Sequence, residues 1–204
     1  MEEEKWIKWS RELLSISKTG ITYAKTYYDE ERFKRIYEIA EEIVNTNFKT
    51  MPEMRIITQD IQKGYATPQV TTRGIIKRKN EILLVHEKGK QWNIPGGYAD
   101  INDTPTQAVC REILEETGYK VRVKGVVAIY SVLHNMIFPQ YAMYFLCELN
   151  ESEDFFPINN ETDAIQFVSI DKIEFYDINQ HFRFHWSKLK QLINEEEALC
   201  IEVD

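Results

Sequence analysis

The chain has 204 residues, a formal net charge of −8 and a pI of about 5.2, and its length suits one domain or two small ones. The acidic balance disfavours electrostatically driven binding of nucleic acid, although a bound metal ion would still admit a small anionic substrate. With 43% hydrophobic and 12% aromatic residues, the chain can bury a substantial core.

The sequence carries no sign of export or membrane insertion. Its first residues, MEEEKWIKWS, are acidic and lack the apolar stretch of a signal peptide, and no apolar run approaches the length that spans a bilayer. The three cysteines are far apart and form no CxxC pair, which is typical of free thiols in a reducing compartment: Cys110, Cys147 and Cys200. We therefore expect a cytoplasmic protein with no membrane partner.

Residues 1–66 are predicted to form a small all-helical domain. Apolar residues recur at three- and four-residue spacing over 6–16, and Gly20 is the expected stop of this first helix. Asp29 is expected to cap a second helix, and a shorter third helix is expected over 52–62.

A hairpin of this kind leaves aromatic side chains in need of cover. They are Trp6, Trp9, Tyr23, Tyr27 and Tyr28. An apolar surface of this composition marks packing against a partner or the next domain more often than a catalytic site.

Residues 67–204 alternate between short strands and helices. The expected strands are 70–77, 81–87, 121–132, 141–149 and 164–170. One helix should begin near Pro105 and end at Gly118, and another should cover 180–197. This alternation predicts an α/β sandwich, in which helices flank a mixed sheet.

The helix after Pro105 carries three glutamates on one face. Glu112, Glu115 and Glu116 have the i, i+3, i+4 spacing that brings side chains together on a helix. Like charges at this spacing destabilise a helix unless a counter-charge is present, and a divalent cation supplies one. Ligation by oxygen alone favours Mg²⁺ or Mn²⁺ over structural zinc. The simpler alternative is a solvated acidic face.

The segment that contains these glutamates resembles the Nudix box, Gly-x5-Glu-x7-Arg-Glu-U-x-Glu-Glu-x-Gly-U, where U is a bulky apolar residue. The residues in register are Gly97, Arg111, Glu112, Ile113, Glu115, Glu116, Gly118 and, as an aromatic, Tyr119. The one departure is Asp103, which stands where the pattern has glutamate. The resemblance covers about residues 68–196 and implies a Nudix-type α/β/α sandwich. It also implies metal-dependent hydrolysis of a nucleoside diphosphate linked to another group, X.

The resemblance also implies roles for individual residues. Glu112, Glu115, Glu116 and the carbonyl of Gly97 would hold the metal, with Glu116 as the permanent ligand and Glu112 alternating between ligand and base. Arg111 lies four residues before Glu115, so a salt bridge that orients that carboxylate is possible. Glu161, in a polar loop before a strand, would be an additional ligand or base, unless it is only a solvated loop acid.

Two further segments resemble bacterial hydrolases that act on CDP-choline or ADP-ribose. They are the opening WIKWSRELLSISKTGITYAK and the run IPGGYADINDTP. In that group the N-terminal helices commonly serve dimerisation, so the resemblance implies a homodimer.

Five residues are candidates for substrate binding: Arg73, Glu87, Tyr98, Tyr130 and His134. Arginine suits phosphate oxygens, and the two tyrosines could stack on a base or enclose a choline. The competing interpretations are a strand-edge salt bridge for Arg73, core packing for the tyrosines and a surface position for His134. His181 and His185 are one helical turn apart, but the aromatic residues around them favour packing over zinc binding.

Three other functions remain open from sequence. A hydrolase of nucleoside triphosphates would use the same carboxylates with a different pocket. A ligand-sensing regulator is disfavoured because all three helix glutamates are present. Processing of RNA 5′ ends is disfavoured by the acidic pI.

Overall fold

The computed structural model of the chain describes residues 4–48, 67–133, 139–150 and 162–194. The chain divides into two compact units. One comprises Met1–Gln69 with Ser131–Gln140, and the other comprises Val70–Tyr130 with Tyr141–Asp204.

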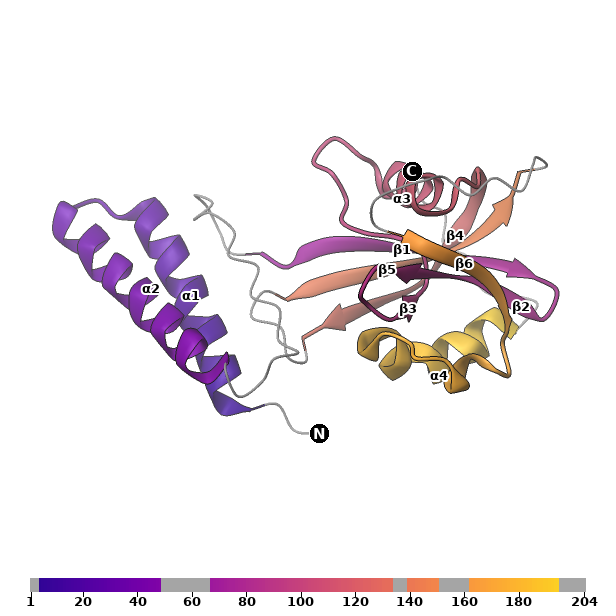
Figure 1. The fold of residues 1–204 in the computed structure, drawn as a ribbon. Coiled ribbons are helices and arrows are strands. Elements are labelled where there is room, and N and C mark those ends of the chain that lie inside the picture. The colour runs from indigo at the N-terminus through magenta and orange to yellow at the C-terminus, as the bar shows by residue number, and fades with distance from the viewer. Residues whose placement is uncertain (1–3, 49–66, 134–138, 151–161, 195–204) are drawn as a thin grey trace. The chain divides into compact units, whose positions relative to one another are not determined.

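The first unit contains a helical hairpin, α1 (Lys5–Tyr23) and α2 (Tyr27–Phe48) (Figure 1). Its small core takes apolar residues at helical spacing from both helices: Ile7 and Leu14 from α1, and Tyr37, Ala40 and Val44 from α2. On the outside, large apolar side chains are exposed on both helices: Trp9, Ile16, Tyr23, Tyr27, Tyr28 and Ile39. The hairpin therefore buries one apolar face and exposes others.

Both predicted boundaries between these helices are wrong by a few residues. Gly20 does not stop α1 but lies inside it, where an added Cβ would overlap the ring of Phe33. Its role is to let the two helices approach closely. Thr26, not Asp29, caps α2, because the amide of Asp29 donates to Thr26 Oγ1 at 3.1 Å. The third helix predicted over 52–62 lies outside the described residues.

In the described part of the chain, six strands form one sheet in the second unit. The strands are β1 (Gln69–Arg78), β2 (Glu81–Glu87), β3 (Trp92–Asn93), β4 (Val121–Val132), β5 (Gln140–Leu149) and β6 (Thr162–Ser169). Their order is β3-β2-β1-β5-β4, and β6 pairs with β2. The β2–β6 pair is antiparallel and runs from Glu81 opposite Ser169 to Glu87 opposite Thr162. This register places the start of β6 beside the end of β2.

Two helices cover opposite faces of this sheet (Figure 1). They are α3 (Pro105–Thr117) and α4 (Gln180–Asn194), and a short 3₁₀ helix, Ile173–Phe175, precedes α4. The predicted α/β/α sandwich with a helical N-terminal segment is confirmed. The 3₁₀ helix and the two-residue strand β3 were not predicted from the sequence.

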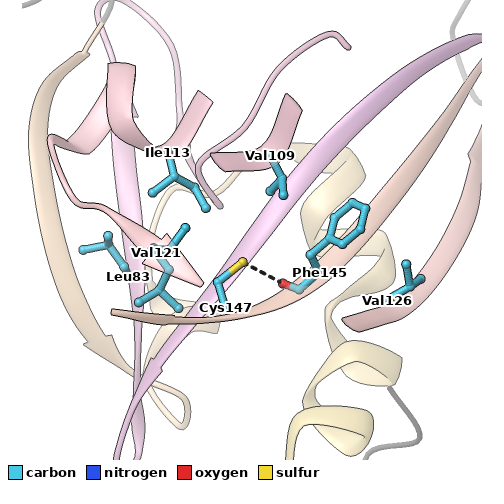
Figure 2. Close-up of a cluster of buried hydrophobic side chains, with 8 residues drawn as sticks. Leu83, Val109, Ile113, Val121, Val126, Phe145 and Cys147 are labelled. Carbon is cyan, nitrogen blue, oxygen red and sulfur yellow. Dashed lines mark hydrogen bonds between the residues drawn. The ribbon is translucent and has the colours of Figure 1, made fainter. Parts of the chain in front are cut away.

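Helix α3 is fixed by its core contacts and by both ends. Val109 and Ile113 project from it onto a buried cluster on the sheet that includes Phe145 and Cys147 (Figure 2). Burying such side chains contributes roughly 1.5–3 kcal/mol each. Thr104 and Gln107 form a reciprocal capping box at its start, and Gly118 closes it in the left-handed conformation with φ 73°. The acidic face of α3 is therefore held in a defined orientation.

Candidate active site

The glycine loop runs alongside the first strand of the sheet. Thr72 N donates to the carbonyl of Gly97 at 2.8 Å, and Gly74 N donates to that of Pro95 at 2.9 Å. Gly96 has φ 141°, and an added Cβ would overlap the carbonyl oxygen of Thr72. Only glycine allows this close approach. The Gly97 carbonyl, a candidate metal ligand, retains its second lone pair because one N–H uses only the first.

Glu116 is the most deeply buried carboxylate of α3, with 7% of its surface exposed. Its Oε2 accepts a hydrogen bond from the amide of Gly96 at 2.7 Å, which joins α3 to the glycine loop. Burial raises the pKa of Glu116 to about 7, against the lowering effects of Arg73 and the Gly96 amide, and the charges of Glu87 and Glu112 add to the rise. Burial is therefore the main reason why the ionised form of Glu116 is disfavoured.

Arg111 faces two of the glutamates of α3. Its Nη1 donates to Glu112 Oε1 at 2.7 Å and to Glu115 Oε2 at 3.3 Å, so the predicted Arg111–Glu115 pair is present. The Arg111 side chain is only 28% exposed, so most of its surface is covered by neighbouring residues. Burial lowers the pKa of Arg111, but its hydrogen bonds to Asp103 and Glu112 outweigh this effect and raise the pKa above the usual value.

Arg111 also holds the loop that follows the glycines. Its Nε donates to Asp103 Oδ2 at 3.0 Å and its Nη2 donates to the carbonyl of Tyr98 at 3.1 Å. Asp100 lies farther away, with Oδ2 3.6 Å from Nη2. The contacts of Arg111 with Asp103 and Asp100 were not predicted from the sequence. The register of the motif marked Asp103, but only the structure shows that its partner is Arg111.

The three glutamates of α3 differ in their surroundings. Glu112 has a side chain only 16% exposed, it lies against Gly97, and burial raises its pKa. Glu115 is 59% exposed and points to Arg111 and solvent. Among the described residues, no three His, Cys, Asp or Glu side chains are gathered closely enough to hold a metal together.

The donor set nevertheless fits a hard divalent cation. Mg²⁺ is usually bound through one or two carboxylates, with waters and substrate phosphates completing its shell. Glu116 and Glu112 supply two carboxylates beside the glycine loop, and burial raises the pKa of both, which disfavours their ionised forms. A cation at this point would stabilise the ionised carboxylates.

Arg73 and Glu87 both lie near Glu116. Arg73 Nη1 donates to the carbonyl of Ile94 at 3.2 Å and also to that of Gly96, so part of its guanidinium supports the loop. Its charge lowers the pKa of Glu116, which places it within electrostatic reach of the carboxylates. Glu87 is paired with Lys90 at the turn after β2.

Aromatic rings gather between the sheet and α4. Tyr130 stacks on His185 with ring centres 4.3 Å apart and meets Tyr144 edge-on at 5.8 Å. His185 is buried, and burial lowers its pKa to about 4, with the charges of His181 and Lys188 adding to the effect. The interpretation of His185 as a packing residue is therefore confirmed.

The remaining candidates are spread over the chain. Tyr98 is 42% exposed beside the glycine loop, so its ring is not part of the core. Glu161 and His134 lie outside the described residues. Within the described residues, no helix is both long and apolar enough to cross a bilayer.

Comparison with known proteins bears on both parts of the chain. Residues 67–190 match the Nudix domain family, and residues 4–54 match a family described as a UDP-X-like N-terminal oligomerisation domain. The chain is 28% identical over 156 residues to the putative ADP-ribose pyrophosphatase YjhB of Bacillus subtilis (strain 168), and the match covers 74% of this chain and 75% of that relative.

Solved structures give the same grouping. A UDP-X diphosphatase aligns with a TM-score of 0.53 and 25% identity, over 94% of this chain and 96% of that one. An ADP-ribose pyrophosphatase from Streptococcus suis aligns with a TM-score of 0.53 and 27% identity, over 64% and 95%. The Nudix match spans more than half of the chain and is joined by hydrolase relatives, and together they show that the chain belongs to the Nudix family of pyrophosphohydrolases.

Proposed function

We propose that the protein hydrolyses a nucleoside diphosphate linked to a further group X, with Mg²⁺ or Mn²⁺, and releases a nucleoside monophosphate and phosphorylated X. ADP-ribose and CDP-choline are the first substrates to test. The proposal is supported by the relatives named as ADP-ribose pyrophosphatases and UDP-X diphosphatase. The observation that carries it is the buried carboxylate of Glu116, which accepts a hydrogen bond from the Gly96 amide and whose pKa is raised by burial.

In this proposal Glu116, Glu112 and the Gly97 carbonyl hold the metal. When bound, the ion supplies charge neutralisation at the phosphates and lowers the pKa of a bound water. Glu116 is prearranged by the Gly96 amide, which fixes one of its oxygens. Glu115 is more exposed, and we assign it a supporting role at the edge of the site.

Glu112 is the proposed acceptor of the proton from the attacking water. Its Oε1 is engaged by Arg111, whereas the carboxylate also lies against Gly97. One oxygen is thus anchored and the other faces the glycine loop, which suits a base of fixed orientation. Glu161 is kept as the alternative base in the proposal.

The substrate is proposed to lie along the glycine loop. Arg73 would orient a phosphate with the guanidinium hydrogens that do not support the loop, and Glu87 would border the same site. Tyr98 is exposed beside the loop and offers a ring face. Tyr130 presents an aromatic group near α4, and we assign it to the base or to X.

We further propose that residues 1–66 make the protein a homodimer and that residues 67–204 carry the hydrolase. The exposed aromatic residues of the hairpin and the oligomerisation family matched by residues 4–54 support this assignment. Light scattering of the full chain will give its mass in solution, and a monomer at micromolar concentration would remove the dimer from the proposal.

A product screen tests the proposed reaction. The full chain is incubated with Mg²⁺ or Mn²⁺ and, separately, with ADP-ribose, CDP-choline, a UDP-sugar and the common nucleoside triphosphates, and the products are separated by chromatography. We expect AMP, CMP or UMP from a diphosphate conjugate, and no product with Glu116→Gln. Release of pyrophosphate from triphosphates alone would replace the proposal with a triphosphate hydrolase. Tight binding without turnover would indicate a sensor.

A further inference from the structure

We propose that the hydroxyl group of Thr72 accepts a hydrogen bond from a water molecule bound to the divalent cation, so that Thr72 is a positioning residue of the metal site. The inference rests on the metal site of the proposed function, in which Glu116, Glu112 and the Gly97 carbonyl hold the ion. It adds a residue of strand β1 to a site whose other proposed ligands come from α3 and the glycine loop.

The hydroxyl of Thr72 has no hydrogen-bond partner within the described part of the protein. Thr72 lies in β1 with no exposed surface, and its Oγ1 is buried without a partner among the described residues. A buried hydroxyl in this position costs free energy, whereas valine has nearly the same shape and no polar atom. Packing alone therefore favours valine, and a partner from outside the chain accounts for the hydroxyl.

Backbone pairing places Thr72 directly opposite Gly97. Thr72 N donates to the Gly97 carbonyl at 2.8 Å, and the neighbouring residues Thr71 and Tyr98 form an antiparallel bridge. Residues that face each other in an antiparallel pair direct their side chains to the same face. An added Cβ at Gly97 would overlap the carboxylate of Glu112. The Thr72 side chain therefore projects on the face where Glu112 lies.

The alternation of β1 gives the same orientation independently. An added Cβ at Gly74 would overlap Ile113, a residue of α3, so position 74 faces this helix. Thr72 is two positions earlier in the same strand and therefore also faces α3. Thr72 thus faces the helix that carries Glu112, and its own amide binds the carbonyl of Gly97.

A metal-bound water suits this hydroxyl as a partner. Mg²⁺ is usually bound through one or two carboxylates and keeps several water ligands. The cation polarises such a water, which makes it a good hydrogen-bond donor, and a threonine hydroxyl has lone pairs that accept. An enclosed water needs about two to four polar partners. The cation, Thr72 Oγ1 and the carboxylate of Glu112 would supply them.

The test compares metal binding in matched variants of the full chain. Mn²⁺ is titrated without substrate and followed by electron paramagnetic resonance. Thr72→Val removes the hydroxyl and should weaken Mn²⁺ binding about tenfold, the lower end of the effect of groups that support metal ligands. Thr72→Ser keeps the hydroxyl and should stay within about twofold of wild type. Thr71→Val, on the opposite face of β1, is the control and should also stay within about twofold.

Stability gives a second readout, in which a hydroxyl that only supports packing would have the opposite effect. In EDTA, Thr72→Val should melt at the same temperature as wild type or higher, because it removes a buried hydroxyl without a described protein partner. At one fixed Mn²⁺ concentration, the variant should gain less in melting temperature than wild type, because stabilisation by a ligand follows its affinity. Thr72→Ala also lacks the hydroxyl and replaces Thr72→Val if that variant does not fold.

Three results would overturn the proposal. They are equal Mn²⁺ affinity of Thr72→Val and wild type, an equal loss of affinity in Thr72→Val and Thr72→Ser, and a loss in Thr71→Val as large as that in Thr72→Val. The proposed reaction fails separately. A protein that binds Mn²⁺ and shows the Thr72 effect but hydrolyses no diphosphate conjugate would refute only the substrate assignment, and hydrolysis without a Thr72 effect would refute only the role of Thr72.

Discussion

Helices α2 and α3 both carry arginine and several acidic residues at helical spacing, yet the two charged faces have different surroundings. On α2, Arg35 pairs with Glu38 at 2.9 Å and both side chains are 58% exposed. On α3, Arg111 pairs with Glu112 at 2.7 Å and the side chains are 28% and 16% exposed. The spacing of charges is similar, and the difference lies in what each face meets.

Burial distinguishes the charged face of α3, a candidate metal site, from the exposed charged face of α2. The acids of α2 have basic neighbours on the same helix and are surrounded by water, which screens them. Glu112 and Glu116 of α3 face the glycine loop, where Glu116 is buried and its pKa is raised to about 7. A similar pattern in sequence thus supports solubility on one helix and a candidate metal site on the other.

The largest expected effect is on enzymatic activity, which substitutions on α3 and α2 should change to very different extents. Glu116→Gln should lower turnover of the preferred substrate by at least about a thousandfold, because it removes a metal-binding charge while keeping the side-chain shape. Glu38→Gln, its counterpart on α2, should leave kcat and KM unchanged. Steady-state kinetics with circular dichroism as the fold control will show this. Comparable activity of the two variants would contradict the assignment of different roles to the acidic faces of α3 and α2.

The arginines offer a matched pair of substitutions that preserve charge. Arg111→Lys should lower kcat about tenfold to a hundredfold, since lysine cannot donate at once to Asp103, the Tyr98 carbonyl and the glutamates. Arg35→Lys should have no effect on kcat. If Arg111→Lys retained full activity, only the positive charge of Arg111 would matter and not its planar geometry.

The pH dependence of stability should reveal the buried carboxylate without any metal. The folded-state pKa of Glu116, about 7, lies above the ordinary 4.5. Its contribution to stability is therefore fully present below pH 4.5 and is lost as the pH rises through about 7. In EDTA, the free energy of unfolding of Glu116→Gln relative to that of wild type should rise by about 2 kcal/mol from pH 5.5 to pH 8.5.

Urea unfolding at the two pH values measures this gain. Glu38→Gln is the control and should track wild type at both, because its side chain is 58% exposed. A constant difference between Glu116→Gln and wild type would mean that Glu116 titrates normally in the folded protein.

The smallest expected effect concerns the exposed ion pairs of α2, such as Arg35–Glu38. Glu38→Gln should shift the melting temperature by less than about 2 °C, and raising the salt concentration should reduce the shift further. Calorimetry at low and high salt would measure both values. A large shift in melting temperature that does not depend on salt would show that the ion pairs of α2 are not simply exposed to solvent.

Sequence predicted the elements well where the local signals were strong. Pro105 and Gly118 marked the ends of α3, and alternation located the longer strands. The prediction that Gly20 ends α1 was wrong because this glycine serves a tertiary contact. It makes room for Phe33, a residue of the other helix. Thr26 was missed because Asp29 is an equally good capping residue type and only the hydrogen bonds distinguish the two.

The candidate site was predictable in composition but not in arrangement. The motif placed Glu112, Glu115 and Glu116 on one face, yet it did not show that Glu116 is buried and Glu115 exposed. That difference depends on how the glycine loop packs against α3. The hydrogen bond from Arg111 to Asp103, across eight positions in sequence, likewise follows from the loop conformation and not from spacing alone.

The most direct test of this account is a titration of Mn²⁺ into wild-type protein and Glu116→Gln, read by electron paramagnetic resonance in the absence of substrate. We predict that wild type binds Mn²⁺ and that Glu116→Gln, correctly folded by circular dichroism, loses that binding. Equal binding by the two proteins would contradict the assignment of the α3 carboxylates as the metal site.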